Sequence, residues 1–357
     1  MNSIGIDYHK RYSVICIVDE TGAELHMERI EHAFPERIEQ CLTAYAPCQA
    51  AFESTMNWGW LYEILETIPG LERIVMANPL HVRLISAAQV KTDKIDARKL
   101  ANLLRANLLP SSHIPDRATR LRKEVLRQRT FWVRQRTKVR NRVHRLLGRQ
   151  HGLAMPQVTD LFGKKGRTAL SKLTLPPPED LLLRQQLAVL DVLQEQIREL
   201  ELQIKVEGRQ DPATEGLSTI PGIGAIIGNV IATEIDGIAR FDNSDRLCAY
   251  AGLIPSTSSS GDKTHHGRLV ASCNKWLRWA FVEAAWVAVG CSPYLGGLYR
   301  HHRARGKKAN TAIMIVARRM CQIAFCVLKE KRGYQEVGPR SNPLPGRSHI
   351  SRTTQAA

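Results

Sequence analysis

The first third of the chain alternates between two hydrophobic periods. Short runs of β-branched residues bounded by turn residues predict strands, beginning with a hairpin over residues 2–18. Apolar residues three or four apart predict helices instead. The strands are expected at 2–18 (the hairpin), 22–30, 49–52 and 73–77, and the helices at 35–45, 58–68 and 92–107. This order, β-β-β-α-β-α-β-α, predicts an α/β sheet of mixed direction on the ribonuclease-H-like plan.

A long basic segment follows. Residues 117–149 contain thirteen lysines or arginines and a single acid, Glu124. Their apolar residues form one narrow stripe, so the pattern predicts a long basic helix with a break near Thr130. Residues 151–180 are predicted to be irregular, because Lys164-Lys165-Gly166-Arg167 and the run Pro176-Pro177-Pro178 are typical of a linker.

The remainder is predicted to be mainly helical. Residues 183–205 place apolar side chains three and four apart with charges between them, which predicts a coiled-coil arm and self-association. A second linker is expected at 208–216, and the stretches 273–289 and 309–330 are apolar enough for buried helices. The tail after Gly338 is rich in Pro, Ser, Arg and Thr and is predicted to be disordered.

The chain has 357 residues, which suits two domains and a connector better than one domain. The predicted division is 1–112 for the α/β domain, 113–210 for the basic helix, linker and coiled-coil arm, 211–337 for a mainly α C-terminal domain, and 338–357 for the tail.

Charge indicates the kind of partner. Lysine and arginine number 51 against 34 aspartates and glutamates, a net charge of +17. This excess favours nucleic acid, with an anionic membrane surface as the second interpretation and a basic protein without a polyanionic partner as the third. Hydrophobic residues make up 43% of the chain, so sizeable cores can form.

The cysteines and the apolar runs indicate the compartment. None of the eight cysteines forms a Cys-x-x-Cys pair, so we expect buried free thiols in a reducing environment, neither disulfides nor a zinc site. The N-terminus lacks the pattern of a signal peptide. The longest apolar stretch, Phe281–Val289, contains Glu283 and is too short to cross a bilayer. The protein is expected to be cytoplasmic, with no membrane partner.

Four carboxylates are candidates for chemistry. Asp7 ends the first predicted strand and Glu53 the fourth, and these strands are neighbours in the predicted sheet. Asp93 and Asp96 stand three apart on one face of the next helix. Four hard oxygen donors at one point suit Mg²⁺ or Mn²⁺. Two such ions would activate the attacking oxygen and stabilise the leaving one in phosphodiester chemistry.

Each carboxylate also has a structural interpretation. Asp93 is a candidate helix N-cap, and Asp96 a favourable charge in the first helical turn. Asp7 is placed to close a turn, and Glu53 to pair with a lysine. An acid among apolar strand residues is nevertheless costly to bury unless it is paired or binds a cation, which favours the metal site when the four are taken together.

Taken with later motifs, these residues resemble a known family. The order of Gly5-Ile6-Asp7, the strand-ending Glu53, Lys-Thr-Asp93-x-x-Asp96-Ala-Arg, Pro-Gly-Ile-Gly at 221–224 and Ala-Gly-Leu-Ile-Pro at 251–255 followed by Ser-Gly is similar to that of the DEDD transposases of bacterial insertion sequences. The resemblance covers residues 3–335. It implies a RuvC-like N-terminal domain in which Asp7, Glu53, Asp93 and Asp96 bind Mg²⁺. One departure is Met56, where the family usually has glycine.

The resemblance also implies partners. Donor and target DNA are the substrates, and a bridge RNA encoded by the element guides the protein by base pairing. The protein is expected to act as a homo-oligomer, a dimer or a tetramer in the synaptic complex.

A serine-rich segment, residues 251–261, would by composition be a flexible loop. The family carries a nucleophilic serine a few residues after Gly-Leu-x-Pro and directly before glycine. Ser260 matches this position best, and Ser259 is the second choice. The resemblance implies that Ser260 attacks the scissile phosphate and forms a transient phosphoserine link to DNA, activated by the carboxylate metal site of the partner protomer.

Pro-Gly-Ile-Gly at 221–224 lies between two predicted helical segments. It looks like the hairpin of a helix-hairpin-helix motif, in which glycines let the backbone approach a phosphate. A plain turn between two helices explains the same four residues equally well.

Basic residues are the expected nucleic-acid contacts, with salt-dependent binding. The candidates in the basic helix and the C-terminal half are Arg122, Lys123, Arg127, Arg134, Arg136, Lys138, Arg140, Arg268, Lys275 and Arg278. A solvated basic face is the alternative for each. Phe131 and Trp132 are candidates to stack on bases, with core packing as the alternative. The resemblance implies that the basic helix and the N-terminal domain hold the guide RNA.

The expected function is therefore that of a transposase that cuts and exchanges DNA strands. One alternative is a RuvC-like structure-specific endonuclease that uses metal-activated water, which would need no serine. The other is a nucleic-acid-binding protein without catalysis, in which the four acids would be dispensable.

Overall fold

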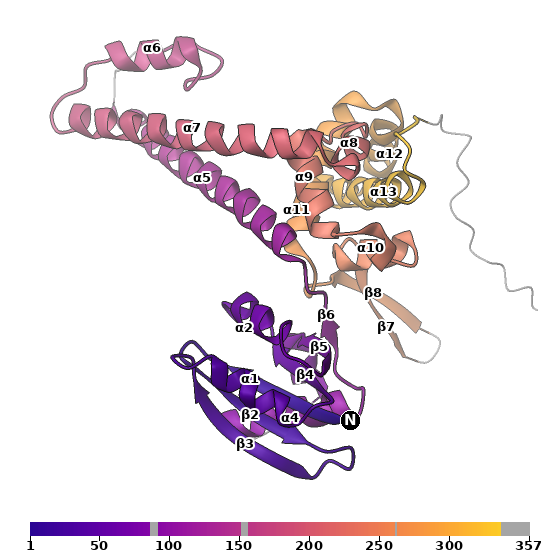
Figure 1. Cartoon of the computed structure of the whole chain (residues 1–357). Coiled ribbons are helices and arrows are strands. Elements are labelled where there is room, and N and C mark those ends of the chain that lie inside the picture. The colour runs from indigo at the N-terminus through magenta and orange to yellow at the C-terminus, as the bar shows by residue number, and fades with distance from the viewer. Residues whose placement is uncertain (86–91, 151–155, 261–262, 337–357) are drawn as a thin grey trace, which may run out of the picture. The chain divides into compact units, whose positions relative to one another are not determined.

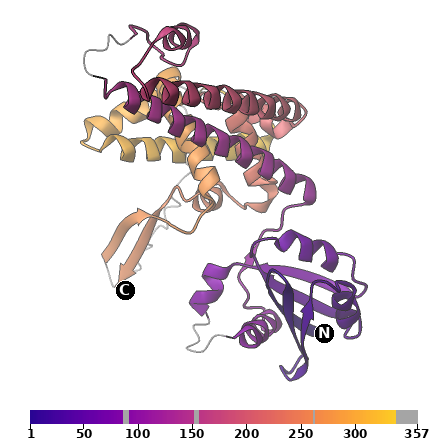
Figure 2. The same ribbon diagram turned by 90° about the vertical axis from the view of Figure 1, so that its left-hand side faces the viewer.

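A computed structural model describes residues 1–85, 92–150, 156–260 and 263–336. It contains two compact units, Met1–Pro115 and Asp116–Ala357, which are described in turn (Figures 1 and 2). The tail predicted to be disordered lies outside the described residues.

The first unit is built on a six-stranded sheet with the strand order β3-β2-β1-β4-β5-β6. Its elements are β1 (Asn2–Tyr8), β2 (Tyr12–Val18), β3 (Glu24–Glu31), α1 (Glu36–Thr43), β4 (Cys48–Glu53), α2 (Trp58–Leu65), β5 (Leu71–Ala77), α3 (Pro79–Ile85), α4 (Asp93–Arg105) and β6 (Ser111–Ser112). β1 runs antiparallel to β2 and parallel to β4. The predicted mixed α/β sheet is confirmed, with β1 and β4 as neighbours; α3 and β6 were not predicted.

The two faces of this sheet carry different helices. Alternate residues of a strand point to opposite faces. Ile4 and Ile6 of β1 belong to a core that includes Ile38 of α1 and Leu61 of α2. On β2, the residues of the opposite face, such as Cys16, pack instead with α4.

The contact between α4 and β1 is made at Gly5. A methyl group built on Gly5 would lie 2.0 Å from the carbonyl oxygen of Ala97 and 2.5 Å from the backbone nitrogen of Ala101. No residue with a Cβ fits this approach of backbone to backbone. Glycine at this position therefore lets α4 lie directly on the sheet.

The buried residues of α4 show which side of the helix faces the sheet. Ala97, Leu100, Ala101 and Leu104 are buried, and they form two rows in which successive residues are four apart. Asp93 begins the first row and Asp96 the second. The helix therefore carries both carboxylates on the side that faces the sheet.

The second unit is mainly helical, as predicted. Its elements are α5 (Arg117–Leu147), α6 (Lys164–Lys172), α7 (Glu179–Arg209), α8 (Pro212–Ser218), α9 (Ala225–Ile235), a 3-10 turn η1 (Ile238–Arg240), α10 (Ser244–Tyr250), β7 (Pro255–Ser260), β8 (Lys263–Leu269), α11 (Lys275–Cys291), α12 (Pro293–Ala304) and α13 (Ala309–Glu330). α11 and α13 correspond to the two predicted buried helices.

Three local predictions were wrong. α5 is continuous through Thr130, whose hydroxyl donates a hydrogen bond to the carbonyl of Leu126 at 2.9 Å and so stays within the helix. The segment predicted to be irregular contains α6. The predicted linker at 208–216 is mostly helical, because α7 ends at Arg209 and α8 begins at Pro212.

α5 and α7 lie side by side as a long antiparallel pair (Figures 1 and 2). Leu183, Leu187 and Leu190 of α7 pack with Val143 and Leu147 of α5. The apolar stripe that predicted a coiled-coil arm is thus covered by a helix of the same chain. Self-association through this stripe is therefore not supported, and an oligomer would need another surface.

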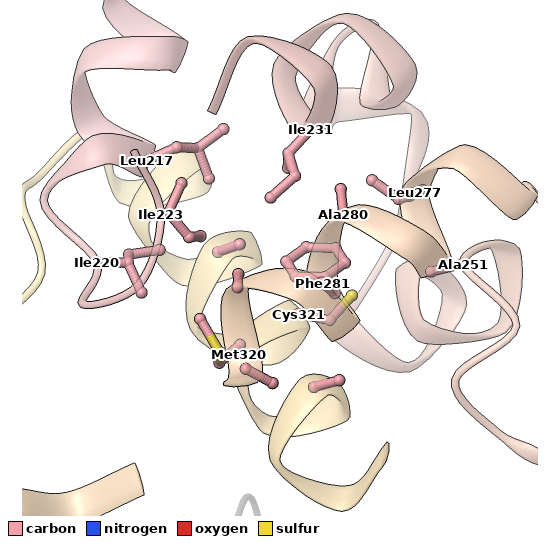
Figure 3. Packing of buried hydrophobic residues seen from close by; sticks show 14 of the residues in the cluster. Leu217, Ile220, Ile223, Ile231, Ala251, Leu277, Ala280, Phe281, Met320 and Cys321 are labelled. Atoms are coloured by element: carbon pink, nitrogen blue, oxygen red, sulfur yellow. The ribbon is translucent and has the colours of Figure 1, made fainter. Parts of the chain in front are cut away.

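The C-terminal helices enclose one large core. Figure 3 shows the ring of Phe281 among apolar side chains that include Ile223, Ile231 and Met320. α13 is long and apolar enough to cross a membrane by length and composition, and α11 with α12 passes the same test as a bent pair. α13 buries residues along its length, from Ile313 to Val327, in this protein core, which is the environment of a core helix.

The Gly5 contact makes a testable prediction. Gly5→Ala should force α4 away from β1 and lower the free energy of unfolding of the first unit by at least about 2 kcal/mol, because the methyl group meets backbone that cannot rotate away. Hydrogen–deuterium exchange in peptides that cover α4 should accelerate. Gly290→Ala is the control: a Cβ there meets no atom within 4 Å, and its effect should stay within about 1 kcal/mol. Unchanged exchange in α4 of Gly5→Ala would contradict the role of this contact.

Candidate metal centre and nucleic-acid interface

The pairing of β1 with β4 brings Asp7 and Glu53 to the same edge of the sheet. The two strands are parallel, and Gly5 and Ile6 pair with Ala51 and Phe52. Asp7 and Glu53 come next in each strand, at the carboxyl ends. Ala51 packs with Leu104 of α4, so Glu53, two residues further on, lies on the face that α4 covers.

The tightest part of the site is formed by Asp7, His9 and Asp93. His9 Nε2 lies 3.1 Å from Asp7 Oδ2 and 3.4 Å from Asp93 Oδ2. The hydroxyl of Tyr12 donates a hydrogen bond to Asp93 Oδ2 at 2.9 Å. One potential ligand atom from each of Asp7, His9 and Asp93 lies within 4.8 Å of the others.

His9 is the residue of this site that sequence reasoning missed. The available signal was Asp-x-His at the end of a strand, because residues two apart on a strand point to the same side. The imidazole touches both carboxylates, and it therefore holds them at a common point.

The surroundings of Asp7 favour a cation. Burial raises the pKa of Asp7 above its usual value, and the negative charges of Asp93 and Asp96 raise it further, while His9 opposes the shift. Carboxylates held together in this way repel one another unless a positive charge lies between them. Hard carboxylate oxygens suit Mg²⁺ or Mn²⁺, whereas imidazole suits softer metals, so His9 fits the role of a positioning group.

The helix end that carries Asp93 is capped by another residue. Thr92 is the N-cap of α4, and its side chain accepts a hydrogen bond from the backbone nitrogen of Ile95. The interpretation of Asp93 as the N-cap is therefore wrong. Asp96 lies in the first turn, 3.3 Å from Lys99 Nζ. Asp96 and Glu53 stand outside the compact group of three, on the same face of the sheet.

The serine-rich segment is a strand rather than a loop. Residues 255–260 form β7, which pairs with β8 as an antiparallel ribbon extending from the helices (Figure 1). Ser260 is the last residue of β7 and pairs with Lys263. The predicted nucleophile therefore lies at the end of the ribbon, directly before residues 261–262, which are outside the described residues.

The Pro-Gly-Ile-Gly motif does join two helices, α8 and α9. Gly222 has a φ of +87°, and a Cβ on it would lie 2.4 Å from the carbonyl oxygen of Ala284 on α11, so this glycine is needed for packing. Gly224 is the N-cap of α9, and a Cβ on it would meet nothing within 4 Å. A contact of this turn with phosphate remains a prediction.

Several of the predicted nucleic-acid contacts are committed to partners within the second unit. The buried carboxylate of Glu234 lies 3.7 Å from Lys123 Nζ and 3.4 Å from Arg127 Nη2, and it accepts a hydrogen bond from Asn274 at 2.9 Å. These contacts join α5, α9 and α11. Lys123 is itself buried and has a structural role.

Three further arginines of the predicted set also have internal contacts. Arg122 lies 3.9 Å from Asp211, and Arg136 donates a hydrogen bond to Gln194 at 2.9 Å. Arg278 donates one to the carbonyl of Val270.

Other cations form an exposed row along α5. Arg134, Lys138, Arg142 and Arg145 are exposed and three or four apart, so they share one side of the helix over roughly 16 Å at about 1.5 Å per residue. Arg149 continues the row after the helix ends. We call these five residues the basic row. Beside it is a hollow lined by Arg142, Arg145 and Arg149 together with Leu182 and Gln186 of α7.

The remaining candidates lie elsewhere in the second unit. Arg268 on β8 and Lys275 at the start of α11 are exposed. Arg140 lies over the ring of Phe162, 5.0 Å from its centroid. Phe131 is 46% exposed and Trp132 is half-buried beside it, with 4.8 Å between the ring centroids.

Two transposase family profiles match this chain, one starting in the first unit and one lying within the second. A transposase family profile for DEDD proteins of the IS110 type matches residues 4–151. A second profile, described as the transposase IS116/IS110/IS902 family, matches residues 214–300.

Full-length relatives agree with these profiles. The transposase for insertion sequence element IS1328 of Yersinia enterocolitica is 27% identical, covering 91% of this chain and 96% of that protein. A probable family 20 transposase of Pseudomonas aeruginosa is 25% identical, covering 94% and 99%. A putative transposase of Sinorhizobium fredii is 24% identical, covering 92% and 89%.

The cluster of Asp7, His9 and Asp93 leads to a prediction about the binding of divalent cations. Asp7→Asn should weaken Mn²⁺ binding to the full chain by more than tenfold, because it removes a charged donor. His9→Ala should weaken it by about tenfold, the usual effect of a group that orients ligands. Calorimetric titration measures both, and Glu72→Gln, an exposed acid on β5, is the control. Equal Mn²⁺ affinity in Asp7→Asn and the unchanged protein would rule this site out.

The basic row makes a second prediction. The double variant Lys138→Gln/Arg142→Gln should weaken binding to duplex DNA or RNA and lower the slope of log affinity against log salt by about two, one for each lost phosphate contact. Fluorescence anisotropy across a salt series measures this slope. Arg198→Gln, an exposed arginine of α7 paired with Glu195, should leave it unchanged. A double variant with an unaltered slope would show that the nucleic acid binds elsewhere.

Proposed function

We propose that the chain is an insertion-sequence transposase of the IS110/IS116 family, because profiles of that family match residues in both of its units, and that it cuts and exchanges DNA strands with a metal-dependent serine nucleophile. The carboxylates of the first unit would hold Mg²⁺, and Ser260 of the second would attack the DNA. The two would serve one reaction. The observation that carries the metal half is the convergence of Asp7, His9 and Asp93 beside the Gly5 contact.

The four acids have separable tasks in this proposal. Asp7 and Asp93 supply the central pair of oxygen donors, and Glu53 and Asp96 complete the hard donor set from the same face of the sheet. His9 and the Tyr12 hydroxyl keep the central pair oriented through their contacts with Asp7 and Asp93. A divalent cation bound there would supply Lewis-acid stabilisation of charge on the phosphate oxygens. The strand order also supports the ribonuclease-H-like, RuvC-like assignment of the unit.

The serine half rests on the match of Ser260 to the family's nucleophile position. Its Oγ would form a bond to the scissile phosphorus while the bond from phosphorus to the deoxyribose oxygen breaks. The serine proton leaves to a base, and the departing oxygen takes one up. Attack on the phosphoserine by a hydroxyl of another DNA strand would then rejoin the backbone and release the serine.

Sequence recognition is proposed to lie with a guide RNA rather than with the protein. The basic row would contact phosphates, which carry no sequence information, so base pairing with the RNA would select donor and target. Exposed Arg268 and Lys275 near the ribbon would clamp the DNA backbone beside the reacting phosphate. The active form would be a dimer, or a tetramer in the synaptic complex.

A RuvC-like endonuclease is the second candidate. The observation that favours it is that the carboxylate site is assembled within the first unit, which would suffice for hydrolysis by metal-activated water. In that reaction Ser260 would have no covalent role.

A recombination assay in cells distinguishes the two. The full chain is supplied with donor DNA, target DNA and the RNA of its own element, and recombined junctions are counted. Ser260→Ala and Asp7→Ala should each abolish junctions, because each removes one half of the reaction, while both proteins still fold and retain RNA binding. Ser256→Ala, an exposed serine earlier in the same strand, is the matched control.

An active Ser260→Ala protein would contradict the assignment. Loss of junctions in Ser259→Ala alone would move the nucleophile by one residue. Cleaved DNA without recombined junctions from the unchanged protein, with cleavage lost in Asp7→Ala, would favour the endonuclease.

A further inference from the structure

A second group of potential metal ligands lies on the opposite face of the N-terminal sheet. His26 and Glu28 are two apart on β3, where they pair with Ile17 and Ile15 of β2. Those two isoleucines belong to the core covered by α1 and α2. Cys41 comes from α1 on that same face. The group is therefore separated by the sheet from Asp7 and Asp93, which lie on the face of α4.

The distances within this group are close to those of a coordination sphere. His26 Nε2 lies 3.2 Å from Glu28 Oε2, and one ligand atom from each of His26, Glu28 and Cys41 lies within 4.8 Å of the others. Ligands of tetrahedral zinc, bound at about 2.0–2.3 Å, are about 3.3–3.7 Å from one another. The three atoms need to move by about an ångström or less to share one ion.

Neighbouring residues hold two of the three ligands. Arg37 of α1 pairs with the other carboxylate oxygen of Glu28, leaving Oε2 directed at His26. The ring of Tyr45 stacks on that of His26, with the centroids 5.7 Å apart. Hydrogen bonding of a ligating carboxylate and fixing of a ligating imidazole are usual features of metal sites. The side chains of His26 and Glu28 are 35% and 25% exposed, so an ion has access to them.

We propose that His26, Glu28 and Cys41 bind Zn²⁺, with a fourth position open to water. Thiolate and imidazole ligands select zinc over Mg²⁺, whereas the carboxylates around Asp7 select the harder ion. The chain would thus sort two metals onto two faces of one sheet. β3 is the edge strand of that sheet, and the ion would tie it to α1.

The thiol of Cys41 is protonated before the ion arrives. Burial raises the pKa of Cys41 to about 11, and the charge of Glu28 adds to the rise, while Arg37 opposes it. Zinc binding would release this proton. The absence of a Cys-x-x-Cys pair led to the opposite expectation from sequence, because these ligands come from a strand and the helix that follows it.

Cobalt spectroscopy tests the site directly. Co²⁺ added to the full chain should give a thiolate-to-metal charge-transfer band and the visible bands of tetrahedral cobalt, saturating at one equivalent and displaced by Zn²⁺. Cys41→Ser should lose the charge-transfer band. Cys326→Ser, which replaces an exposed cysteine of α13, should keep it. His26→Gln should keep the fold and weaken Co²⁺ binding at least tenfold.

Thermal unfolding gives an independent readout. Zn²⁺ should raise the melting temperature of the unchanged protein and not that of Cys41→Ser. The doubly substituted Asp7→Ala/Asp93→Ala protein should keep the cobalt bands, because the two sites are separate, so failure of one site is distinguishable from failure of the other. A charge-transfer band that persists in Cys41→Ser, or no band in the folded wild-type chain, would overturn the proposal.

Discussion

At Gly5 the backbone of β1 meets the backbone of α4, and the geometry of the N-terminal unit depends on this contact. A Cβ at that position would lie 2.0 Å from the Ala97 carbonyl oxygen, far inside van der Waals contact, so the close approach exists only because glycine is there. Asp7 is two residues beyond Gly5 on the strand, and Asp93 is one helical turn before Ala97 on the helix. The contact that packs the two elements therefore also brings their carboxylates together. Like charges assembled by packing in this way are a reason to expect a cation.

The second unit uses charge in two different ways along one helix. In the first half of α5, Lys123 and Arg127 converge on the buried carboxylate of Glu234, and this network fastens α5 to α9 and α11. Removing Glu234 would leave the buried ammonium of Lys123 without this carboxylate, which is costly. In the second half, Arg134, Lys138 and Arg142 face solvent in one row. The positive charge of α5 therefore comes from two kinds of residue. Some pair with carboxylates inside the unit, and others are exposed and available to a polyanion.

Much of the fold could be predicted because hydrophobic period and local turns decide it. The order of strands and helices in the first unit and the two buried C-terminal helices follow from such patterns. The break predicted near Thr130 is absent. The Thr130 hydroxyl donates a hydrogen bond to the Leu126 carbonyl of its own helix, and α5 continues through this residue. The stripe of α7 gave the correct buried face, but periodicity cannot tell whether α5 of the same chain or a second copy covers it.

Site residues could be predicted where they belong to a sequence motif. They could not be predicted where only the tertiary structure brings them together. Asp7, Glu53, Asp93 and Asp96 stand in recognisable sequence contexts. His9 meets Asp93 only because the end of β1 lies against the start of α4, and Cys41 meets His26 only because α1 covers β3. The division of arginines into paired and exposed ones also depends on distant partners such as Asp211 and Gln194.

Trapping the covalent intermediate would show whether Ser260 is a nucleophile that depends on the carboxylate metal site. DNA carrying a nick beside the scissile phosphate would prevent rejoining, and the protein–DNA product would be digested and mapped by mass spectrometry. We expect a nucleotide attached to the peptide that contains Ser260, formed with Mg²⁺ and absent in Asp7→Ala. Cleaved DNA with a free terminal phosphate and no attached peptide would show that water, and not Ser260, is the nucleophile.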